Sequence, residues 1–366
     1  MDLSLKYYYV NLPMIEPFVY SEETEVSRNG YIFRLSTDEV TAFSECVSND
    51  NPFYLSEYNT TSINVIKEYL SKHIGDLPEP HEFLQRVEHI KGHEFAKGAL
   101  EMLLWDYKAK KQGLPLYKIL DGGTKGYAET GVSIGLDSTD KMVKKVERAV
   151  NKHYKRIKVK ISKGREQDIL SAVRDRFPEI KLTADANSNY RISDIDLLKK
   201  IDKFNLTYLE QPLNSDDLID HSSLRKQIST PICLDESIIS SEKMRKALEI
   251  RALDVVNIKP GRVGGFYNSL KIAKLAKDNG IHVWIGGMEE TSVGKNYNVA
   301  IASSKLIDYP GDTGPTSEFF SRDIVTNPLT MENGIVKPSD EIGIGVKIDE
   351  AFLDKVTVHS GVIKLS

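Results

Sequence analysis

Cysteine is scarce in this chain, because Cys46 and Cys233 are the only two among 366 residues. Cys233 lies inside a short apolar run of the kind that forms a buried strand. A disulfide or a catalytic thiol would need partner residues that the sequence does not show. We therefore expect both cysteines to be reduced residues of the core.

Long apolar runs, basic blocks and low-complexity stretches are also missing. No apolar run approaches the roughly 18 residues that a membrane helix needs, and residues 1–9 include Asp2 and Lys6 but no signal-peptide core. With a net charge of −4 and a pI near 6.1, the chain is not expected to bind nucleic acid. The sequence thus predicts a cytoplasmic protein with neither a membrane nor a nucleic acid as partner.

What the chain does contain is a regular series of charged residues. Lys160, Asp185, Glu210, Asp235 and Lys259 follow one another at intervals of 25, 25, 25 and 24 residues. A strand of about five residues, a helix of about 10 to 15 and two loops fill roughly 25 residues, which is one β/α unit of a parallel barrel. Because the chemistry of such barrels lies at the C-terminal ends of the strands, these charges are expected to meet in one cavity.

Each of the five charges ends or follows a short apolar run that is typical of a buried parallel strand. The strands expected on this basis are residues 156–161, 182–185, 206–210, 232–235 and 255–259, with others at 131–134, 282–286 and 306–310. Helical stretches lie between them, for example at 167–176, 193–204 and 241–250. Eight strands alternating with helices predict an α/β fold of the TIM-barrel class.

The chain exceeds the about 250 residues of a bare barrel, so a second domain is expected. Antiparallel strands are indicated at residues 7–12, 30–35 and 41–47, and an amphipathic helix at 94–112. Strand-like runs at 343–348 and 356–365 follow after the barrel spacing ends. We expect an α+β capping domain at 1–125, a catalytic barrel at 126–326, and a C-terminal segment at 327–366 that returns to the cap.

Three carboxylates, those of Asp185, Glu210 and Asp235, are expected at successive strand ends. Crowded carboxylates repel one another, which raises their pKa values unless a cation neutralises them. All-oxygen ligands suit a hard ion such as Mg²⁺ or Mn²⁺, whereas zinc is disfavoured because no His or Cys accompanies them. For any one acid, ion pairing with a neighbouring lysine is an equally good explanation. Three acids at a 25-residue period favour a metal site.

Lys158 and Lys160 leave the same face of their strand because they are two residues apart. Lys259 ends the strand four places further on in an eight-stranded barrel, so an amine would lie on either side of a metal-bound ligand. A lysine acts as a base only when neutral, and a second lysine, a divalent cation and desolvation would lower its pKa to about 7 to 8. The alternative is that Lys158 and Lys160 are barrel lysines paired with Asp185. A metal with a lysine base suits abstraction of the proton α to a carboxylate.

Five strings in this order carry a family resemblance: Arg156-Ile-Lys-Val-Lys-Ile161, Asp185-Ala-Asn187, Leu209-Glu-Gln-Pro212, Pro231-Ile-Cys-Leu-Asp-Glu-Ser237 and Asn257-Ile-Lys-Pro-Gly-Arg-Val-Gly-Gly265. Together they resemble the enolase superfamily, in its muconate-lactonising subgroup. Within that subgroup they look most like the o-succinylbenzoate synthase and N-acylamino acid racemase branch. The resemblance covers nearly the whole chain and implies a modified TIM barrel, (β/α)7β, with an N-terminal α+β capping domain.

The resemblance also implies a role for individual residues. It makes Asp185, Glu210 and Asp235 the ligands of Mg²⁺, with Mn²⁺ as a substitute. It makes Lys160 the base that removes the α-proton and Lys259 the opposing lysine. The other implied positions are Lys158, Phe18, Tyr54, Ser133 and Met288 at the substrate, and Asn187 and Glu236 in support of the metal site and the base.

The activity implied is that of an o-succinylbenzoate synthase, a carbon-oxygen lyase of menaquinone biosynthesis. Such an enzyme dehydrates 2-succinyl-6-hydroxy-2,4-cyclohexadiene-1-carboxylate, a small-molecule carboxylate. The alternative is an N-acylamino acid racemase, in which Lys160 and Lys259 form an opposing acid/base pair. A dipeptide epimerase is less expected because Asp312 lacks a paired acid to hold a substrate ammonium, and a non-catalytic barrel because all five charges are present. A homo-oligomer is implied by the resemblance alone.

Overall fold

The computed structural model describes residues 3–20 and 23–365. Across these two ranges, no helix is long and apolar enough to cross a membrane. Cys46 and Cys233 are both buried and neither forms a disulfide with another described residue, in agreement with the expectation from the sequence.

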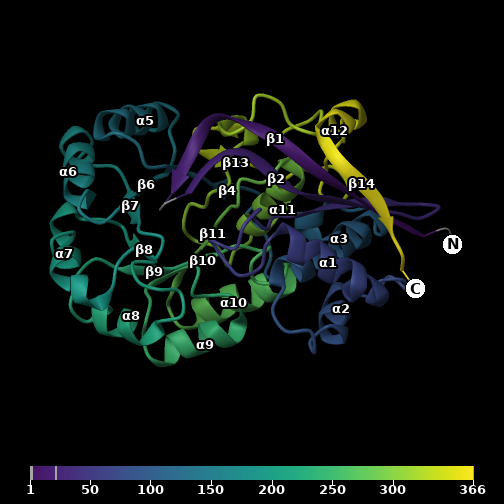
Figure 1. Cartoon of the computed structure of the whole chain (residues 1–366), viewed down its shortest axis with the longest axis horizontal. Helices are drawn as coiled ribbons and strands as arrows, with labels where there is room; N and C mark the ends of the chain where they lie inside the picture. Colours follow the sequence, from purple (N-terminus) through teal and green to yellow (C-terminus); the bar gives the residue numbers. More distant parts are fainter. Residues whose placement is uncertain (1–2, 21–22, 366) are drawn as a thin grey trace.

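A parallel sheet of seven strands curls into the wall of a barrel, in the spatial order β11-β10-β9-β8-β7-β6-β5. Its strands are β5 (Gly131–Ile134), β6 (Arg156–Lys160), β7 (Leu182–Asp185), β8 (Leu209–Glu210), β9 (Ile232–Leu234), β10 (Val255–Ile258) and β11 (His282–Ile285). The helices between them cover its outer face (Figure 1), namely α5 (Thr139–Asn151), α6 (Glu166–Arg176), α7 (Ile195–Lys199), α8 (Leu218–Arg225), α9 (Ser241–Glu249), α10 (Phe266–Asp278) and α11 (Ser292–Ala302). The α/β barrel class predicted from the 25-residue spacing is confirmed.

The barrel closes without a regular eighth strand among the described residues. The segment expected to form it, 306–310, is not a strand, although Asp308 N and Tyr309 N donate to Val283 O of β11 at 3.2 and 3.0 Å. The closing contacts continue at Gly311. Gly311 pairs with Thr130 through a single bridge, and its carbonyl accepts a hydrogen bond from Gly131 N at 2.7 Å. On the other side, Asp312 N donates to Ile285 O at 2.9 Å. A Cβ at Gly311 would lie 2.5 Å from Ile285 O, so the backbone packs too closely here for another residue.

Two other sequence expectations need correction. The helix expected at 193–204 is split into η2 (Ile192–Asp194), α7 and η3 (Asp202–Phe204), because Asp202 turns its carboxylate toward the backbone N–H groups of Ser229 and Thr230. The strand expected at 343–348 is a bent segment, since Gly343 and Gly345 have φ angles of 73° and 71°.

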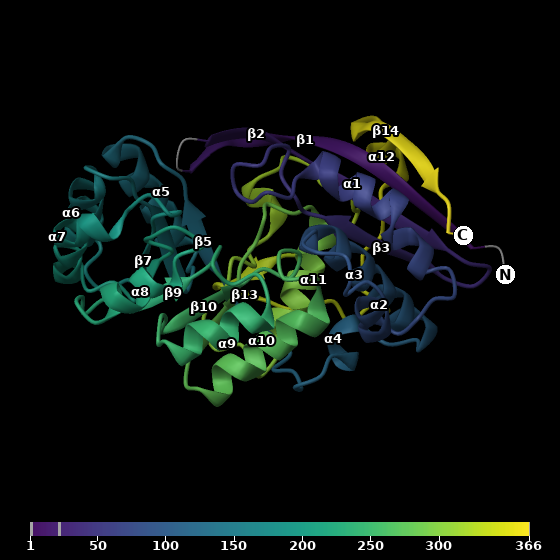
Figure 2. The same cartoon turned by 60° about the horizontal axis from the view of Figure 1, so that its bottom comes forward.

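The cap is built on an antiparallel sheet in the order β14-β1-β2-β3. Its strands are β1 (Ser4–Tyr20), β2 (Glu23–Ser36), β3 (Thr41–Cys46) and β14 (Thr357–Ile363). The long β1 and β2 strands reach from the cap across to the barrel (Figure 2), where Leu136 N donates to Val19 O at 2.8 Å. The domain boundaries at 125/126 and 326/327 stay predictions, but the pairing of β14 with β1 joins the two ends of the described chain in one sheet.

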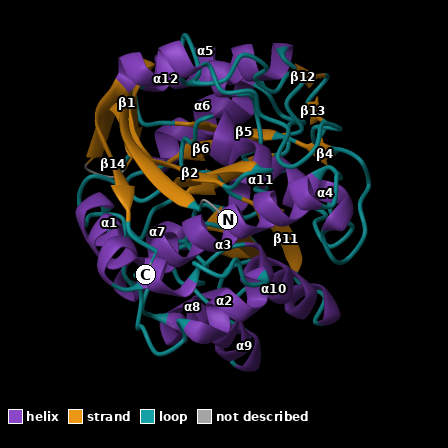
Figure 3. Cartoon of the chain, turned by 90° about the vertical axis from the view of Figure 1, so that its right-hand side faces the viewer, coloured by secondary structure: helices purple, strands orange, loops and turns teal. Residues whose placement is uncertain are grey.

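The helices of the cap pack beside its sheet, next to α10 of the barrel (Figure 3). They are α1 (Asn59–Glu68), η1 (Leu70–His73), α2 (Pro80–Arg86), α3 (Glu94–Lys111) and α4 (Leu116–Ile119). Helix α3 is mostly buried, as expected for a helix packed on several sides. Gly113, with a φ of 66°, follows its C-cap residue Gln112. Its apolar face joins a cap core that also contains Met288 from the rim of the barrel.

A few short elements complete the structure. A small antiparallel sheet is formed by β4 (Ala128–Glu129), β13 (Ile335–Val336) and β12 (Met331–Glu332). The turn η4 (Thr316–Glu318) follows the closing segment of the barrel, and helix α12 (Glu350–Val356) leads into β14. The main apolar core fills the space between the barrel strands and their helices.

Candidate active site

Three carboxylates converge at the C-terminal ends of neighbouring strands, and we call Asp185, Glu210 and Asp235 the carboxylate trio. The register pairs Asp185 of β7 with Glu210 of β8, and Asp235 directly follows β9. Parallel strands in register point equivalent residues to the same side of the sheet, which brings the three side chains into the barrel. Their exposed fractions are 1%, 0% and 1%. The strand spacing therefore does gather these acids into one buried cluster.

Each member of the carboxylate trio contacts a cation of the barrel. Asp185 Oδ2 accepts a hydrogen bond of 2.7 Å from Lys160 Nζ. Glu210 Oε2 lies 3.1 Å from Lys158 Nζ. Asp235 Oδ2 lies 3.1 Å from Lys259 Nζ. The ion pairing that the sequence left open as an alternative is thus present in the structure.

The carboxylate trio offers the oxygen atoms that a hard divalent cation prefers. Within the described residues, no three His, Cys, Asp or Glu side chains are grouped as a ready metal site, because the lysines hold the carboxylates. The donor chemistry nevertheless fits such an ion, since Glu210 Oε2 is buried and accepts no well-directed hydrogen bond from any described residue. Burial, together with the charges of Asp185 and Asp235, raises the pKa of Glu210 to about 7. A bound cation would offset this repulsion.

Lys160 is held at the end of β6 by two oxygen atoms. Its Nζ donates to Asp185 Oδ2 and, at 2.6 Å, to Asn187 Oδ1. Asn187 in turn donates through Nδ2 to Glu236 Oε1 at 3.1 Å. Burial and the nearby Asp235 and Asp185 raise the pKa of Glu236 to about 8. Asn187 therefore links Lys160 to Glu236, and the support of these two residues for the metal site and the base stays a prediction.

Lys259 follows β10 and contacts the other end of the carboxylate trio. Its Nζ donates to the hydroxyl of Tyr54 at 3.0 Å, and that hydroxyl also accepts from Arg262 Nη1 at 2.8 Å. The guanidinium of Arg262 also contacts Asp235 Oδ1. Tyr54 comes from the cap, so a cap residue reaches into the cluster of charges at this lysine.

Lys158 and Lys259 both have raised pKa values. Burial alone would lower the pKa of Lys158, but Asp312, Glu210 and Asp185 outweigh it and raise that pKa well above its ordinary value. Burial alone would also lower the pKa of Lys259, but the charge of Asp235 chiefly raises it well above its ordinary value. Both side chains are therefore cations in this arrangement.

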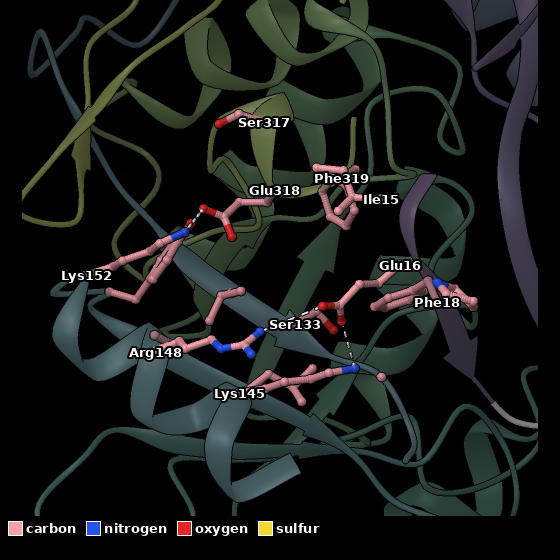
Figure 4. A pocket seen from close by; sticks show the side chains of 16 residues that line it. Ile15, Glu16, Phe18, Ser133, Lys145, Arg148, Lys152, Ser317, Glu318 and Phe319 are labelled. Atoms are coloured by element: carbon pink, nitrogen blue, oxygen red, sulfur yellow. Dashed lines mark hydrogen bonds and ion pairs between the residues drawn. The ribbon is translucent and has the colours of Figure 1, made fainter. Parts of the chain in front are cut away.

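Two of the predicted substrate residues, Phe18 and Ser133, line a cavity of about 280 Å³ between β1, β5, α5 and η4 (Figure 4). Its rim carries Lys145 and Arg148, which face Glu16, and Lys152, which pairs with Glu318 at 2.7 Å. Ser133 pairs in register with Lys158, and its Oγ is buried without a hydrogen bond to a described residue.

A second cavity, of about 620 Å³, opens beside the carboxylate trio, and Tyr54, Asn187 and Glu236 are among its lining residues. Tyr20 also lines it, with its ring centroid 5.7 Å from Lys160 Nζ. Met288 is 4% exposed and packs into the cap core, so the structure does not bring it to the surface of either cavity.

Sequence reasoning missed Arg262, and it did not identify Asp312 as a partner of the cations of β6. Arg262 lies three residues after Lys259, and that spacing is the only signal that could have found it. Asp312 lies 3.1 Å from Lys158 Nζ and also contacts Arg156 Nη2, which closes the network on the side of β6. Both lie in loops without the 25-residue spacing, which explains why the spacing alone did not identify them.

Comparison with known proteins agrees with this architecture. Residues 5–121 match the family model of the mandelate racemase/muconate lactonizing enzyme N-terminal domain, and residues 141–352 match the enolase C-terminal domain-like model. The o-succinylbenzoate synthase of Bacillus subtilis is 38% identical over 95% of this chain and 94% of its own. The N-succinylamino acid racemase of Thermus thermophilus is 38% identical over 95% of both chains.

Solved structures of other proteins superpose on this chain over nearly its full length. A member of the enolase superfamily from Listeria innocua superposes with a TM-score of 0.95, at 35% identity and 99% coverage of both chains. A dipeptide epimerase from Cytophaga hutchinsonii, solved with Mg and a dipeptide, shares the fold with a TM-score of 0.90, at 24% identity and full coverage of both chains. With both domain models and these relatives spanning it, the chain belongs to the mandelate racemase/muconate lactonizing enzyme family of the enolase superfamily.

Proposed function

We propose that this protein is a Mg²⁺-dependent o-succinylbenzoate synthase, which dehydrates 2-succinyl-6-hydroxy-2,4-cyclohexadiene-1-carboxylate. The observation that carries the proposal is the placement of two lysines at opposite ends of the carboxylate trio. Lys160 contacts Asp185 and Lys259 contacts Asp235. The synthase relatives, which are similar to this chain over almost its full length, support the choice of reaction.

In this proposal Asp185, Glu210 and Asp235 would hold Mg²⁺. When bound, the ion would supply positive charge to the substrate carboxylate as negative charge develops on it. The family to which the chain belongs and the Mg-bound dipeptide epimerase of the same fold support this choice of metal.

The chain's own residues would perform the proton transfers. Lys160, once neutral, removes the proton α to the carboxylate, and its ammonium then returns that proton to the hydroxyl that departs as water. Lys259 remains a cation and stabilises the developing negative charge, which agrees with its raised pKa. Lys158, a cation beside Asp185 and Glu210, would bind the substrate carboxylate.

The test is the loss of ultraviolet absorbance of the cyclohexadiene substrate on addition of the purified protein with Mg²⁺. Turnover above about 1 s⁻¹ that EDTA abolishes and excess Mg²⁺ restores is the expected result. Absence of turnover with Mg²⁺ and with Mn²⁺ would overturn the synthase proposal.

A second candidate, N-acylamino acid racemase, is favoured by the same pair of lysines. An amine on each side of a bound substrate can remove the α-proton from one face and return a proton to the other. The racemase relatives support this reaction. Exchange of the α-proton of N-succinyl amino acids with D₂O tests it independently of the dehydration.

A dipeptide epimerase receives no support from the geometry. Asp312 is the acid that would have to help hold a substrate ammonium, and its carboxylate contacts Arg156 and Lys158. These two cations hold the pKa of Asp312 well below its ordinary value. A cytoplasmic location stays a prediction from the sequence, and a homo-oligomeric assembly stays a prediction from the family resemblance.

A further inference from the structure

The loop that carries the second lysine is packed against a helix of the cap. Residues 260–265 connect β10 to α10, directly after Lys259, and all six are buried. Gly264 and Gly265 have φ angles of 85° and 100°, which only glycine adopts without strain. The loop is thus shaped for close contact with a neighbouring element.

That neighbour is α3, which presents a stripe of residues at helical spacing to the loop. A Cβ at Gly264 would lie 2.7 Å from Glu94 Oε2, and one at Gly265 only 2.1 Å from Glu101 Oε2. Between these two acids, Gly98 approaches the loop backbone, where a Cβ would lie 3.0 Å from Gly261 O. Glycine in a helix interior costs about 1 kcal/mol relative to alanine, so Gly98 is explained by this close approach.

Among these residues of α3, Glu101 is the one that accepts hydrogen bonds from the start of α10. Its carboxylate accepts hydrogen bonds from Phe266 N at 2.8 Å and Tyr267 N at 2.9 Å, the first N–H groups of α10. Trp105 Nε1 donates to it at 2.8 Å. The side chain has no exposed surface, and this burial raises its pKa to about 7. Its carboxyl group lies at the positive end of the α10 dipole.

Hydrogen bonds within the loop connect the start of α10 to the backbone of Lys259. Gly265 N donates to Pro260 O at 2.7 Å, and Val263 N donates to Lys259 O at 3.2 Å. Arg262 Nη2 donates to Asn257 O at 2.8 Å, which fixes the loop to strand β10. A shift at the start of α10 therefore moves the backbone of Lys259.

We propose that Glu101 is a positioning residue for Lys259: from the cap, through the buried loop, it sets where the ammonium of Lys259 lies relative to the carboxylate trio. Lys160, on the other side of the barrel, is held by Asp185 and Asn187 and does not depend on this contact. The effect of a Glu101 variant is therefore confined to chemistry at Lys259. This inference rests on the proposed function, in which each lysine serves one face of the substrate.

The experiment compares α-proton exchange in D₂O for the two enantiomers of one N-succinyl amino acid, each followed separately by NMR with the Mg²⁺-loaded enzyme. The Lys160→Ala and Lys259→Ala variants first assign each enantiomer to its lysine. Glu101→Gln is then expected to slow exchange of the Lys259-dependent enantiomer about 10- to 100-fold more than that of the other, the scale expected for a small misplacement of a catalytic group. Equal slowing of both enantiomers would overturn the proposal.

Asp106→Asn is the matched control on the same helix. Asp106 is also fully buried and accepts two backbone hydrogen bonds, from Phe43 N at 2.9 Å and Ile344 N at 2.8 Å, but these lie away from the loop at 260–265. Its variant loses a similar contact and is expected to leave the ratio between the enantiomers unchanged. If Asp106→Asn also slowed exchange of one enantiomer more than that of the other, the effect would be general destabilisation, which contradicts the proposal.

Two further measurements test the role of Glu101 even if Glu101→Gln does not fold or the parent enzyme does not exchange the α-proton. If Glu101→Gln does not fold, Gly98→Ala displaces the same loop and is expected to give the same split between enantiomers. Amide hydrogen exchange of residues 261–267, read by mass spectrometry, needs no substrate and is expected to accelerate in Glu101→Gln but not in Asp106→Asn. Absence of α-proton exchange in the parent enzyme would count against the racemase reaction alone, whereas unchanged amide protection in Glu101→Gln would overturn the inference.

Discussion

The ammonium of Lys259 donates a hydrogen bond to the hydroxyl of Tyr54, and this contact joins the barrel to the cap at the centre of the site. Arg262 donates to the same hydroxyl. One phenol oxygen therefore accepts from two cations while it lies 3.3 Å from Asp235 Oδ2. A cap residue predicted to face the substrate thus also orders the charged groups of the barrel.

Replacement of Tyr54 by phenylalanine is expected to lower kcat about 10- to 100-fold. The change keeps the ring and removes a hydroxyl that accepts from two buried cations and donates to Asp235 Oδ2. A hydrogen bond to a charged group is worth about 1.5–3 kcal/mol. Steady-state dehydration kinetics measure the effect. Tyr117→Phe removes a hydroxyl that bonds Asp340 at the surface and serves as control. Equal kinetics in the two variants would contradict the role of Tyr54.

The two lysines are expected to differ in the dehydration reaction. Lys160→Ala removes the base and should lower kcat by about 10³-fold or more, whereas Lys259→Ala removes only a stabilising charge and should cost about 10²- to 10³-fold. The ultraviolet assay measures both, with Lys144→Ala at an exposed position of α5 as control. A fully active Lys160→Ala variant would exclude the proposed mechanism.

Magnesium is expected to stabilise the folded protein through the carboxylate trio. A ligand present at 100 times its Kd adds about 2.7 kcal/mol to the free energy of unfolding, so Mg²⁺ should raise the Tm and EDTA should reverse the rise. Glu210→Gln should weaken this response, while Glu242→Gln, which alters a surface pair with Arg245, should retain it. An identical Mg²⁺ response in both variants would place the ion elsewhere.

Stability is expected to fall below about pH 6.5 because of His221. This buried imidazole accepts a hydrogen bond from Leu213 N at 3.2 Å, which requires a neutral ring nitrogen. Burial lowers its pKa, although the contact with Asp217 opposes the shift. The unfolded chain, with an imidazole pKa near about 6.5, therefore binds a proton that the folded chain does not. Stability is retained above that value and lost as the pH falls toward the folded pKa.

Urea unfolding between pH 5 and 7 measures this effect against His221→Gln, which has no imidazole to titrate. One linked proton changes the free energy of unfolding by up to about 1.4 kcal/mol per pH unit. The parent protein should show the steeper loss on acidification. Parallel curves for the two proteins would show that another group causes the loss.

The sequence predicted the parts of the fold that depend on local periodicity. The strands that end near Asp185, Glu210 and Lys259 could be placed because a buried parallel strand is an apolar run of fixed length. The closure at Gly311 could not be placed, because it depends on single hydrogen bonds between distant residues rather than on a pattern along the chain.

The candidate site could likewise be predicted from the sequence only in part. The carboxylate trio and the lysines follow from the strand spacing, whereas Arg262 and Asp312 lie in loops, whose course is set by tertiary contacts. The direction of the pKa shift at Lys259 also depended on which carboxylate lies beside it. The sequence could supply the lysine, but not the 3.1 Å separation from Asp235 that decides its charge.

The pairing of β14 with β1 has a consequence for synthesis on the ribosome. Leu5 and Ile363 are partners in register, so one side of β1 stays without its neighbour until the whole barrel has been translated. An uncovered strand edge can pair with other chains, and long-range pairings of this kind form late. The growing chain therefore carries an unpaired strand edge until residues 357–363 have been translated.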